Sequence, residues 1–388
     1  MISHIKKYTM VGLYYLMRVF PINNDRIVID SFWGKGYGDN GKYIAEELLK
    51  HKPGYDIVWL VNDMNYTFPK GIRKVKYLSL KAIYEMATAR IWIDNARKPP
   101  YVRKRKGQFY IMTWHAGIGF KRAEKDVESV LPASYVKLAK ADSKMADLFV
   151  SNSKWQTWNY RTAYWYDGEI AEVGIPREDI FFNADEDMIK GIKQKIGLSE
   201  DVKILFYAPT FRKEHIDNQS ADSMKVYNLD WENALNECRK KFGGKWVGLI
   251  RLHPNMASMA KHLVLPDSVK NVTMYPDMQE LLLAADCMIT DYSSCIVDYS
   301  LTRKPAFLYA SDFDEFKEYR DFYFDLEKLP YPLSTDAAGL IRDIRAFDKA
   351  EYEKKLSDLL DVKCGVFKGG NASAAIAERV SKEIQKHK

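Results

Sequence analysis

Short hydrophobic runs alternate with amphipathic stretches along most of the chain. After Pro21, runs of β-branched and aromatic residues are each followed by a stretch with apolar residues at helical spacing. Buried strands of a parallel sheet have continuous apolar runs of this kind, and helices connect them. The pattern predicts a parallel α/β domain. Its expected strands are residues 26–30, 56–61, 91–94, 109–113 and 148–150, and its expected helices are 42–50, 81–89 and 154–166.

The same alternation begins again after a charged helical connector at residues 185–201. We therefore predict a second α/β domain, followed by a helical tail long enough to cross back to the first. Ligands of open α/β sheets bind outside the carboxyl ends of the strands, so polar motifs are expected there. The expected strands are 203–207, 246–250, 271–275, 287–290 and 305–309, with helices beginning near Trp231, Asp277 and Ser293.

Residues 1–24 form a separate segment with an apolar and aromatic run at 10–17 and basic residues around it. The run is too short to span a bilayer, which takes about 20 apolar residues, and no small-residue cleavage site follows it. Lysines beside an apolar face suit a helix that lies on an anionic membrane surface. A helix docked on the protein's own core has the same pattern, and the sequence favours neither.

Composition narrows the class of partner only slightly. A formal charge of +7 suits an anionic partner such as a nucleotide, a membrane surface or a polyphosphate, although a solvated basic surface explains it equally well. No nucleic-acid-binding motif is present. Four scattered cysteines indicate neither a zinc site nor a disulfide framework, so a reducing compartment is expected.

Three expected strands of the second half end in compact polar motifs. Because carboxyl ends of parallel strands share one edge of the sheet, these motifs should lie close together. Hydroxyls, guanidinium groups and an imidazole there could hold a pyrophosphate and neutralise charge on a departing phosphate. The residues concerned are Thr210 and Arg212, Arg251 and His253, and Asp291, Ser293 and Ser294.

The turn at residues 290–298 has two interpretations. A strand-to-helix junction with Ser293 and Ser294 can bind an anion at the helix start, and Asp298 lies on the same helical face, within reach of a ribose hydroxyl. Alternatively, Asp291 and Ser293 only cap a core helix. Taken alone, the turn favours the cap, but the two neighbouring motifs reverse that preference.

In the first half, the strand at 109–113 leads into His115, Gly117 and Lys121. A histidine at a strand end, followed by glycines and cations, suits a general base beside an anionic substrate. A histidine satisfied by hydrogen bonds under Trp114 is the structural alternative. Asp94 and Asn95, and the Gly-rich loop that ends near Asp39, are further candidates for the same cleft; the loop lacks the dinucleotide-binding spacing.

Together these motifs resemble those of the CDP-glycerol glycerophosphotransferases, which build teichoic acids and related polymers. The resemblance covers most of the chain from about Arg26, although here Ala116 precedes Gly117 where many members read Trp-His-Gly. It rests on Trp114-His115-Ala116-Gly117 with Lys121, Ala208-Pro209-Thr210-Phe211-Arg212, Arg251-Leu252-His253-Pro254, and Thr290-Asp291-Tyr292-Ser293-Ser294 with Asp298.

The resemblance implies a GT-B type fold, in which two Rossmann-like domains face each other across a cleft. It assigns residues 25–185 to an acceptor domain, 186–371 to a nucleotide-donor domain and 372–388 to a helix that crosses back. It implies transfer of a polyol phosphate from CDP-glycerol or CDP-ribitol to a lipid-linked saccharide acceptor. The enzyme would be peripheral, on the cytoplasmic face of the cell membrane.

Within the family's pattern, His115 is the expected base and His253 a second catalytic histidine. Thr210, Arg212, Arg251, Asp291, Ser293, Ser294 and Asp298 would hold the donor, and Gly117, Lys121, Asp94, Asn95 and Asp39 would face the acceptor. No cofactor is required and no acidic cluster suggests a dedicated metal site, which leaves a role for Mg²⁺ open. The alternatives are a sugar-nucleotide glycosyltransferase or epimerase, and a non-catalytic membrane-bound scaffold. The sequence leaves the polyol, the acceptor and the oligomeric state undetermined.

Overall fold

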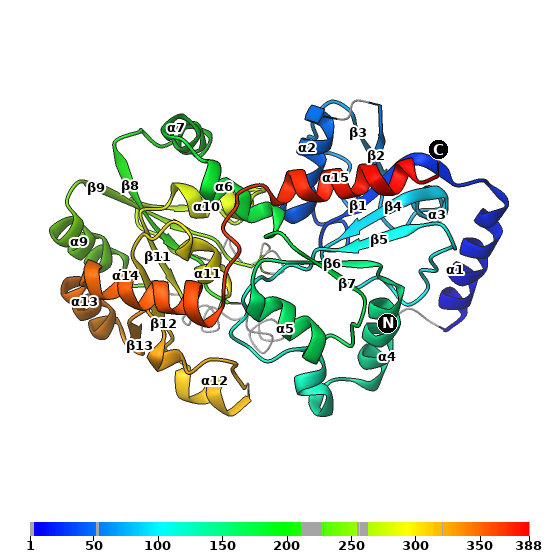
Figure 1. The fold of residues 1–388 in the computed structure, drawn as a ribbon. Helices are drawn as coiled ribbons and strands as arrows, with labels where there is room; N and C mark the ends of the chain where they lie inside the picture. The colour runs from blue at the N-terminus through cyan, green and yellow to red at the C-terminus, as the bar shows by residue number, and fades with distance from the viewer. Residues whose placement is uncertain are drawn as a thin grey trace. The chain divides into compact units, whose positions relative to one another are not determined.

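The computed structural model describes residues 4–51, 54–210, 227, 229–253, 256, 263–319 and 321–387. The chain divides into two compact units, each built on one sheet (Figure 1). Unit 1 comprises residues 1–117, 123–182 and 366–388, and unit 2 comprises residues 118–122 and 183–365. The expected α/β class, with two parallel sheets, is confirmed.

Unit 1 contains a seven-stranded parallel sheet in the order β3-β2-β1-β4-β5-β6-β7. The succession of strands reverses between β1 and β4, which makes the carboxyl ends of these two central strands the topological switch point. The strands are β1 (Asn23–Asp30), β2 (Asp56–Val61), β3 (Ile72–Lys76), β4 (Ala89–Asp94), β5 (Phe109–Met112), β6 (Leu148–Ser151) and β7 (Glu169–Glu172).

Both faces of this sheet are covered, which is why the buried middle of each central strand carries apolar side chains on both faces, as Ile27, Val28 and Ile29 do in β1. Ile27 and Ile29 pack on the face covered by α2 and α15, whereas Val28 packs on the face covered by α1, α3 and α5 (Figure 1). The helices of unit 1 are α1 (His4–Leu16), η1 (Met17–Val19), α2 (Asp39–His51), α3 (Leu80–Thr88), η2 (Glu124–Val130), α4 (Ala133–Met145), α5 (Lys154–Ala163), η3 (Pro176–Glu178), α6 (Asp179–Asn183) and α15 (Ala372–Gln385).

Unit 2 repeats the plan with six parallel strands in the order β10-β9-β8-β11-β12-β13, so its switch point lies between β8 and β11. The strands are β8 (Val202–Tyr207), β9 (Lys245–Ile250), β10 (Val269–Asn271), β11 (Cys287–Thr290), β12 (Ala306–Tyr309) and β13 (Leu333–Ser334). The helices are α7 (Glu186–Lys195), α9 (Trp231–Phe242), α10 (Met278–Ala284), α11 (Cys295–Ser300), α12 (Phe313–Tyr319), η7 (Leu326–Lys328), α13 (Ala337–Ala346), α14 (Lys349–Ser357) and η8 (Asp358–Lys363).

The strand expected at residues 271–275 is wrong, because β10 ends at Asn271. The Asn271 side chain accepts a hydrogen bond from the Thr273 backbone at 3.0 Å, and Tyr275 N donates to Val272 O at 3.0 Å. These local bonds turn the chain where the apolar pattern suggested a strand. The edge strands β3, β7 and β13 were not predicted from the sequence.

The chain passes between the two units at 182/183 and again at 365/366. The domains expected from the sequence, with boundaries at 185/186 and 371/372, stay a prediction. One excursion was not expected: residues 118–122, assigned from sequence to the first domain, belong to unit 2. Arg122 N donates to Asp321 O at 2.9 Å, and Tyr323 N donates to Phe120 O at 2.7 Å. This short antiparallel pairing holds the excursion in unit 2.

The expected N-terminal helix is present as α1, and one side of it packs on unit 1. Tyr14 is buried in the core, and its hydroxyl donates to Met86 Sδ at 3.0 Å. Tyr8, Tyr15 and Leu16 lie on the exposed side. Among the helices that the structure describes, none is long and apolar enough to cross a membrane.

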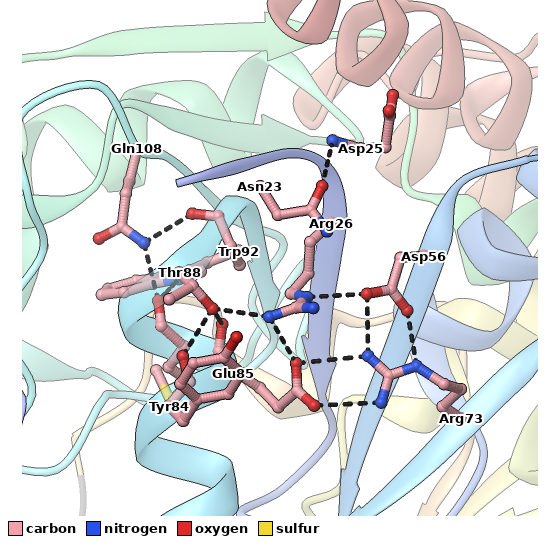
Figure 2. Close-up of polar contacts among 12 residues, drawn as sticks. Asn23, Asp25, Arg26, Asp56, Arg73, Tyr84, Glu85, Thr88, Trp92 and Gln108 are labelled. Carbon is pink, nitrogen blue, oxygen red and sulfur yellow. Dashed lines mark hydrogen bonds and ion pairs between the residues drawn. The ribbon is translucent and has the colours of Figure 1, made fainter. Parts of the chain in front are cut away.

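A closed ring of charges ties the first three strands together at their amino ends (Figure 2). Asp56 lies between Arg26 and Arg73, at 2.8 Å and 2.6 Å, and Glu85 of α3 also pairs with both arginines, at 2.9 Å and 3.1 Å. The Thr88 hydroxyl accepts from Arg26 at 2.7 Å. The candidate site residues lie at the other end of the strands, so this ring is structural.

Candidate active site

His115 lies in the loop that follows β5 in unit 1, and its imidazole is hydrogen-bonded to the loop that follows β4. His115 Nδ1 lies 2.9 Å from the carbonyl oxygen of Asn95, which can only accept, so Nδ1 carries a proton and Nε2 is the basic nitrogen. Burial lowers the pKa of His115, as does Arg177, against opposing effects of the Asn95 bond, Asp39 and Glu124. The imidazole is therefore neutral at pH 7 and can accept a proton at Nε2.

The backbone of the turn that carries His115 is also fixed. Arg177 donates to the His115 carbonyl at 2.7 Å, and Gln156 donates to the Ala116 carbonyl at 2.7 Å. A Cβ at Gly117 would lie 2.3 Å from Asn152 Nδ2, so the glycine is needed for close packing. These contacts limit the freedom of His115, as preorganised catalytic groups require.

The other first-half candidates hold the turn or the core. Asp94 is buried and pairs with Lys98, which places its carboxylate inside unit 1. Asn95 accepts from the Phe32 backbone at 2.8 Å, so it joins the Gly-rich loop to His115. Asp39 accepts from Arg177 at 3.0 Å. Of these three residues, only Asn95 and Asp39 belong to the surroundings of His115.

The loops that follow β8 and β11 meet at the switch point of unit 2. The Asp291 carboxylate accepts from Thr210 N at 2.8 Å and from Tyr292 N at 2.6 Å. The Thr290 hydroxyl donates to Ala208 O at 2.6 Å. The structure thus brings Thr210 and Asp291 together, and the Asp291 carboxylate holds the two loops to each other.

Arg251, directly after β9, has the clearest signature of a ligand-binding group in unit 2. Its Nη1 is buried and has no hydrogen-bond partner in the described part of the chain. Burial lowers the pKa of its guanidinium, while Asp277 raises it. A buried cation with an unsatisfied donor is costly unless a partner arrives, and a phosphate oxygen would supply one. His253 is exposed two residues later.

In the turn after β11, Ser293 makes one long capping contact, in which its Oγ accepts from the backbone N–H of Cys295 at the start of α11. Ser294 is the N-cap residue of α11 but its side chain makes no capping bond, and Ser293 Oγ lies 3.5 Å from Cys295 N. Both serines are half-buried. Since α11 has only six residues, its dipole is small, and side chains would contribute most of any anion binding.

Asp298 is buried, and Gln279 Nε2 donates to it at 2.8 Å. Its ribose role stays a prediction. Lys121 lies in unit 2, with its ammonium group 5.9 Å from the centroid of the Tyr292 ring, and its acceptor role stays a prediction. Arg212 lies outside the described residues.

Sequence reasoning missed the residues that support the site. Arg177 follows β7, and Asn40 is the second residue of α2. Asn40 donates to Trp114 O at 2.9 Å and accepts from Arg177 N at 3.0 Å. The local signals were the polar Pro176-Arg177-Glu178 turn at a strand end and, for Asn40, its place at the end of the Gly-rich loop.

This chain is similar in sequence to curated teichoic acid enzymes and in fold to a solved structure. A poly(glycerol phosphate) polymerase of teichoic acid from Staphylococcus epidermidis is 32% identical over 92% of this chain and 51% of its own length. A teichoic acid glycerol-phosphate transferase from Staphylococcus aureus is 28% identical over 98% of this chain and 99% of its own. The chain spans about half the length of the first two curated relatives that it matches.

A solved structure of the wall teichoic acid polymerase TagF, in a histidine-to-alanine variant, superposes with a TM-score of 0.86. It is 30% identical, and the match covers 98% of this chain and 95% of that one. The family model described as CDP-glycerol:poly(glycerophosphate) glycerophosphotransferase matches residues 13–382. A match over this much of the sequence, together with the two parallel sheets, establishes that the chain belongs to that family.

Proposed function

We propose that this protein transfers a polyol phosphate, most simply glycerol phosphate, from a CDP-activated donor to a hydroxyl of a lipid-linked saccharide acceptor. CMP is the other product, and the reaction serves the synthesis of teichoic acid or a related surface polymer. The family match over residues 13–382 carries this proposal. The neutral imidazole of His115, with Nδ1 bound to Asn95, supports it because Nε2 is then a base.

In the proposed reaction, the acceptor hydroxyl attacks the phosphorus that bears the polyol. Its proton moves to His115 Nε2, the new phosphorus–oxygen bond forms, and the bond to the CMP phosphate oxygen breaks. Arg251 is the first candidate to neutralise the charge on CMP, because its Nη1 is buried and unsatisfied among described residues. Thr210, Arg212, His253, Ser293 and Ser294 are proposed as further donor contacts, and Asp298 as a ribose contact.

Product analysis tests the proposal. Wild-type protein, CDP-glycerol or CDP-ribitol, and a lipid-linked disaccharide should give CMP and an acceptor heavier by one or more polyol phosphates in mass spectra. We expect His115→Ala to reduce CMP release by about 10³-fold or more, the loss typical of a general base combined with proximity. An unchanged thermal midpoint would show that the fold is retained. CMP release at a near wild-type rate would refute the base assignment.

The donor screen also separates the alternatives. Saturable turnover of UDP- or GDP-sugars, with none of CDP-polyols, would identify a sugar-nucleotide glycosyltransferase or epimerase. Donor binding without turnover on any acceptor would identify a scaffold. The family match favours phosphotransfer over both.

We also propose that the protein binds the membrane surface through the exposed side of α1 and η1. Tyr15, Leu16 and Val19 are 52%, 60% and 74% exposed there, while Tyr14 anchors the helix to unit 1. Apolar and aromatic residues on a docked helix can insert into the interface of a bilayer. This arrangement combines the two interpretations of the N-terminal segment.

Vesicle cosedimentation tests the membrane contact. The double variant Tyr15→Glu, Leu16→Glu should bind phosphatidylglycerol vesicles at least tenfold more weakly than the wild type, because charges replace two exposed side chains that would insert into the bilayer. The matched control is Val362→Glu, which changes a residue that is 76% exposed in unit 2. Equal binding by both variants would exclude α1 as the contact.

A further inference from the structure

The segment from Trp114 to Glu124 leaves unit 1, pairs with unit 2 and returns to unit 1. Both of its ends contact one side chain, Arg97. The Arg97 guanidinium lies over the Trp114 ring, 5.2 Å from its centroid, and Arg97 Nη2 donates to the Glu124 carboxylate at 2.9 Å. One buried cation therefore joins the point where the chain leaves to the point where it returns.

Arg97 is itself fixed within unit 1. It is 4% exposed, its Nη1 donates to Ser143 Oγ at 2.6 Å, and the same nitrogen lies 3.3 Å from Asp142. A planar guanidinium can make these directed contacts and stack on an aromatic ring at the same time, whereas an ammonium group cannot. We call the contacts of Arg97 with Trp114 and Glu124 the Arg97 clamp. Its geometry depends on an arginine side chain and not on positive charge alone.

The two ends of the segment need such a clamp. Trp114 and Glu124 both have a φ of +54°, in the left-handed region that side chains other than glycine rarely adopt. Residues persist in such conformations only where surrounding contacts hold them. Asn40 holds the Trp114 carbonyl, and Arg97 holds the side chains of both residues.

The middle of the segment is held separately in unit 2. Phe120 and Arg122 make backbone hydrogen bonds there, and the Lys121 ammonium lies 5.1 Å from the centroid of the Phe316 ring. His115 thus occupies the position directly after the first clamped residue, in a segment that is attached at both ends and in the middle.

We propose that Arg97 is a positioning residue for His115, which it acts on by clamping Trp114 and Glu124. The proposal rests on the proposed role of His115 as the base. Arg97 does not touch the reacting atoms. Its loss lets the turn at Trp114 relax and moves Nε2 away from the position in which it accepts the proton.

The variant Arg97→Lys tests this, with Arg26→Lys as the matched control. Arg26 is also a largely buried arginine paired with two carboxylates, but it belongs to the ring at the amino ends of the strands. For Arg97→Lys we expect kcat for CMP release to fall at least tenfold, with KM for CDP-glycerol within twofold of wild type. Arg26→Lys should lower the thermal midpoint but keep kcat within twofold. Equal kcat for the two variants would overturn the proposal.

The variant Glu124→Gln keeps the test decisive if Arg97→Lys fails to fold. The charged groups that face His115 are Asp39, Arg177 and Glu124. Removing the Glu124 charge should lower kcat and move the acid limb of the pH profile to lower pH, since a nearby anion stabilises an imidazolium. An unchanged kcat with an unchanged limb would contradict the clamp.

Hydrogen exchange separates failure of this inference from failure of the proposed function. Peptides that cover residues 114–124 should exchange at least fivefold faster in Arg97→Lys than in wild type, and Arg26→Lys should leave them unchanged. This result does not depend on turnover. If wild-type protein released no CMP from either donor, the function would be wrong while the exchange data still tested the clamp; unchanged exchange in Arg97→Lys would refute the clamp itself.

Discussion

At the scale of single residues, the backbone of Asn95 decides what His115 can do. A carbonyl that accepts from Nδ1 selects one tautomer and leaves Nε2 as the base. The structural alternative to a general base is a histidine satisfied by hydrogen bonds beneath Trp114. That alternative accounts for the packing of the ring but not for the choice of tautomer. The ring does pack against Trp114, with centroids 4.5 Å apart, but the hydrogen bond fixes the tautomer that a general base requires.

The pH dependence of turnover follows from the same surroundings. Burial lowers the pKa of His115 below its usual 6.5, so the imidazole stays neutral as the pH falls past that value. We expect the acid limb of kcat/KM for CMP release, which reports the free enzyme, to lie below pH 6.5, with activity lost only as the pH passes through the lowered pKa. A profile measured between pH 5 and 9 tests this, and a limb at or above 6.5 would show that another group titrates.

At the scale of secondary structure elements, the charged ring at the amino ends of β1, β2 and β3 supports a part of the sheet that hydrophobic burial supports least. The edge strand β3 is largely polar, and Arg73 connects it to Asp56 of β2 and Glu85 of α3 (Figure 2). Burial would raise the pKa of Asp56, but hydrogen bonds from Arg73 and Arg26 lower it overall. The ring therefore stabilises the fold only while Asp56 is ionised.

The variant Asp56→Asn tests the ring. A hydrogen-bonded charge contributes about 2 kcal/mol, so we expect a loss of about that size in the free energy of unfolding at pH 7. The folded-state pKa of Asp56 is lowered, so its contribution is complete above the unfolded value and disappears as the pH falls towards the folded one. Urea unfolding should therefore show the difference between wild type and variant shrinking below about pH 4. A difference independent of pH would indicate another cause.

The secondary structure elements also show which parts of the fold and of the candidate site could be predicted from the sequence. The central strands could be predicted because burial on both faces leaves an unbroken apolar run, as in residues 57–61. Strand β7, with its exposed glutamates, lies at the edge of the sheet and has no such run. The candidate histidine and arginine could be found from strand ends alone. Their partners could not, because contacts such as Asn40 with Trp114 join residues far apart in the chain.

At the scale of the whole molecule, unit 1 is assembled from three separate stretches of chain, and the last of them is α15. Ile376, Val380 and Ile384 of this helix lie in the core beneath β1 and α2. At its start, the backbones of Ala372 and Ser373 donate to the Asp179 carboxylate at 2.9 Å and 2.7 Å. Unit 1 is therefore complete only when the end of the chain has docked.

Truncation before Ala372 should accordingly destabilise unit 1 and leave unit 2 folded. Three buried aliphatic side chains contribute about 1.5 to 3 kcal/mol each, so the loss amounts to several kcal/mol. Hydrogen exchange should accelerate in peptides from β1 and β4 but remain at the wild-type rate in those from β8 and β11. Removal of residues 386–388 alone, as a control, should change neither set. Equal acceleration in both units would show that they unfold as one cooperative body, and α15 would then support the whole chain instead of unit 1.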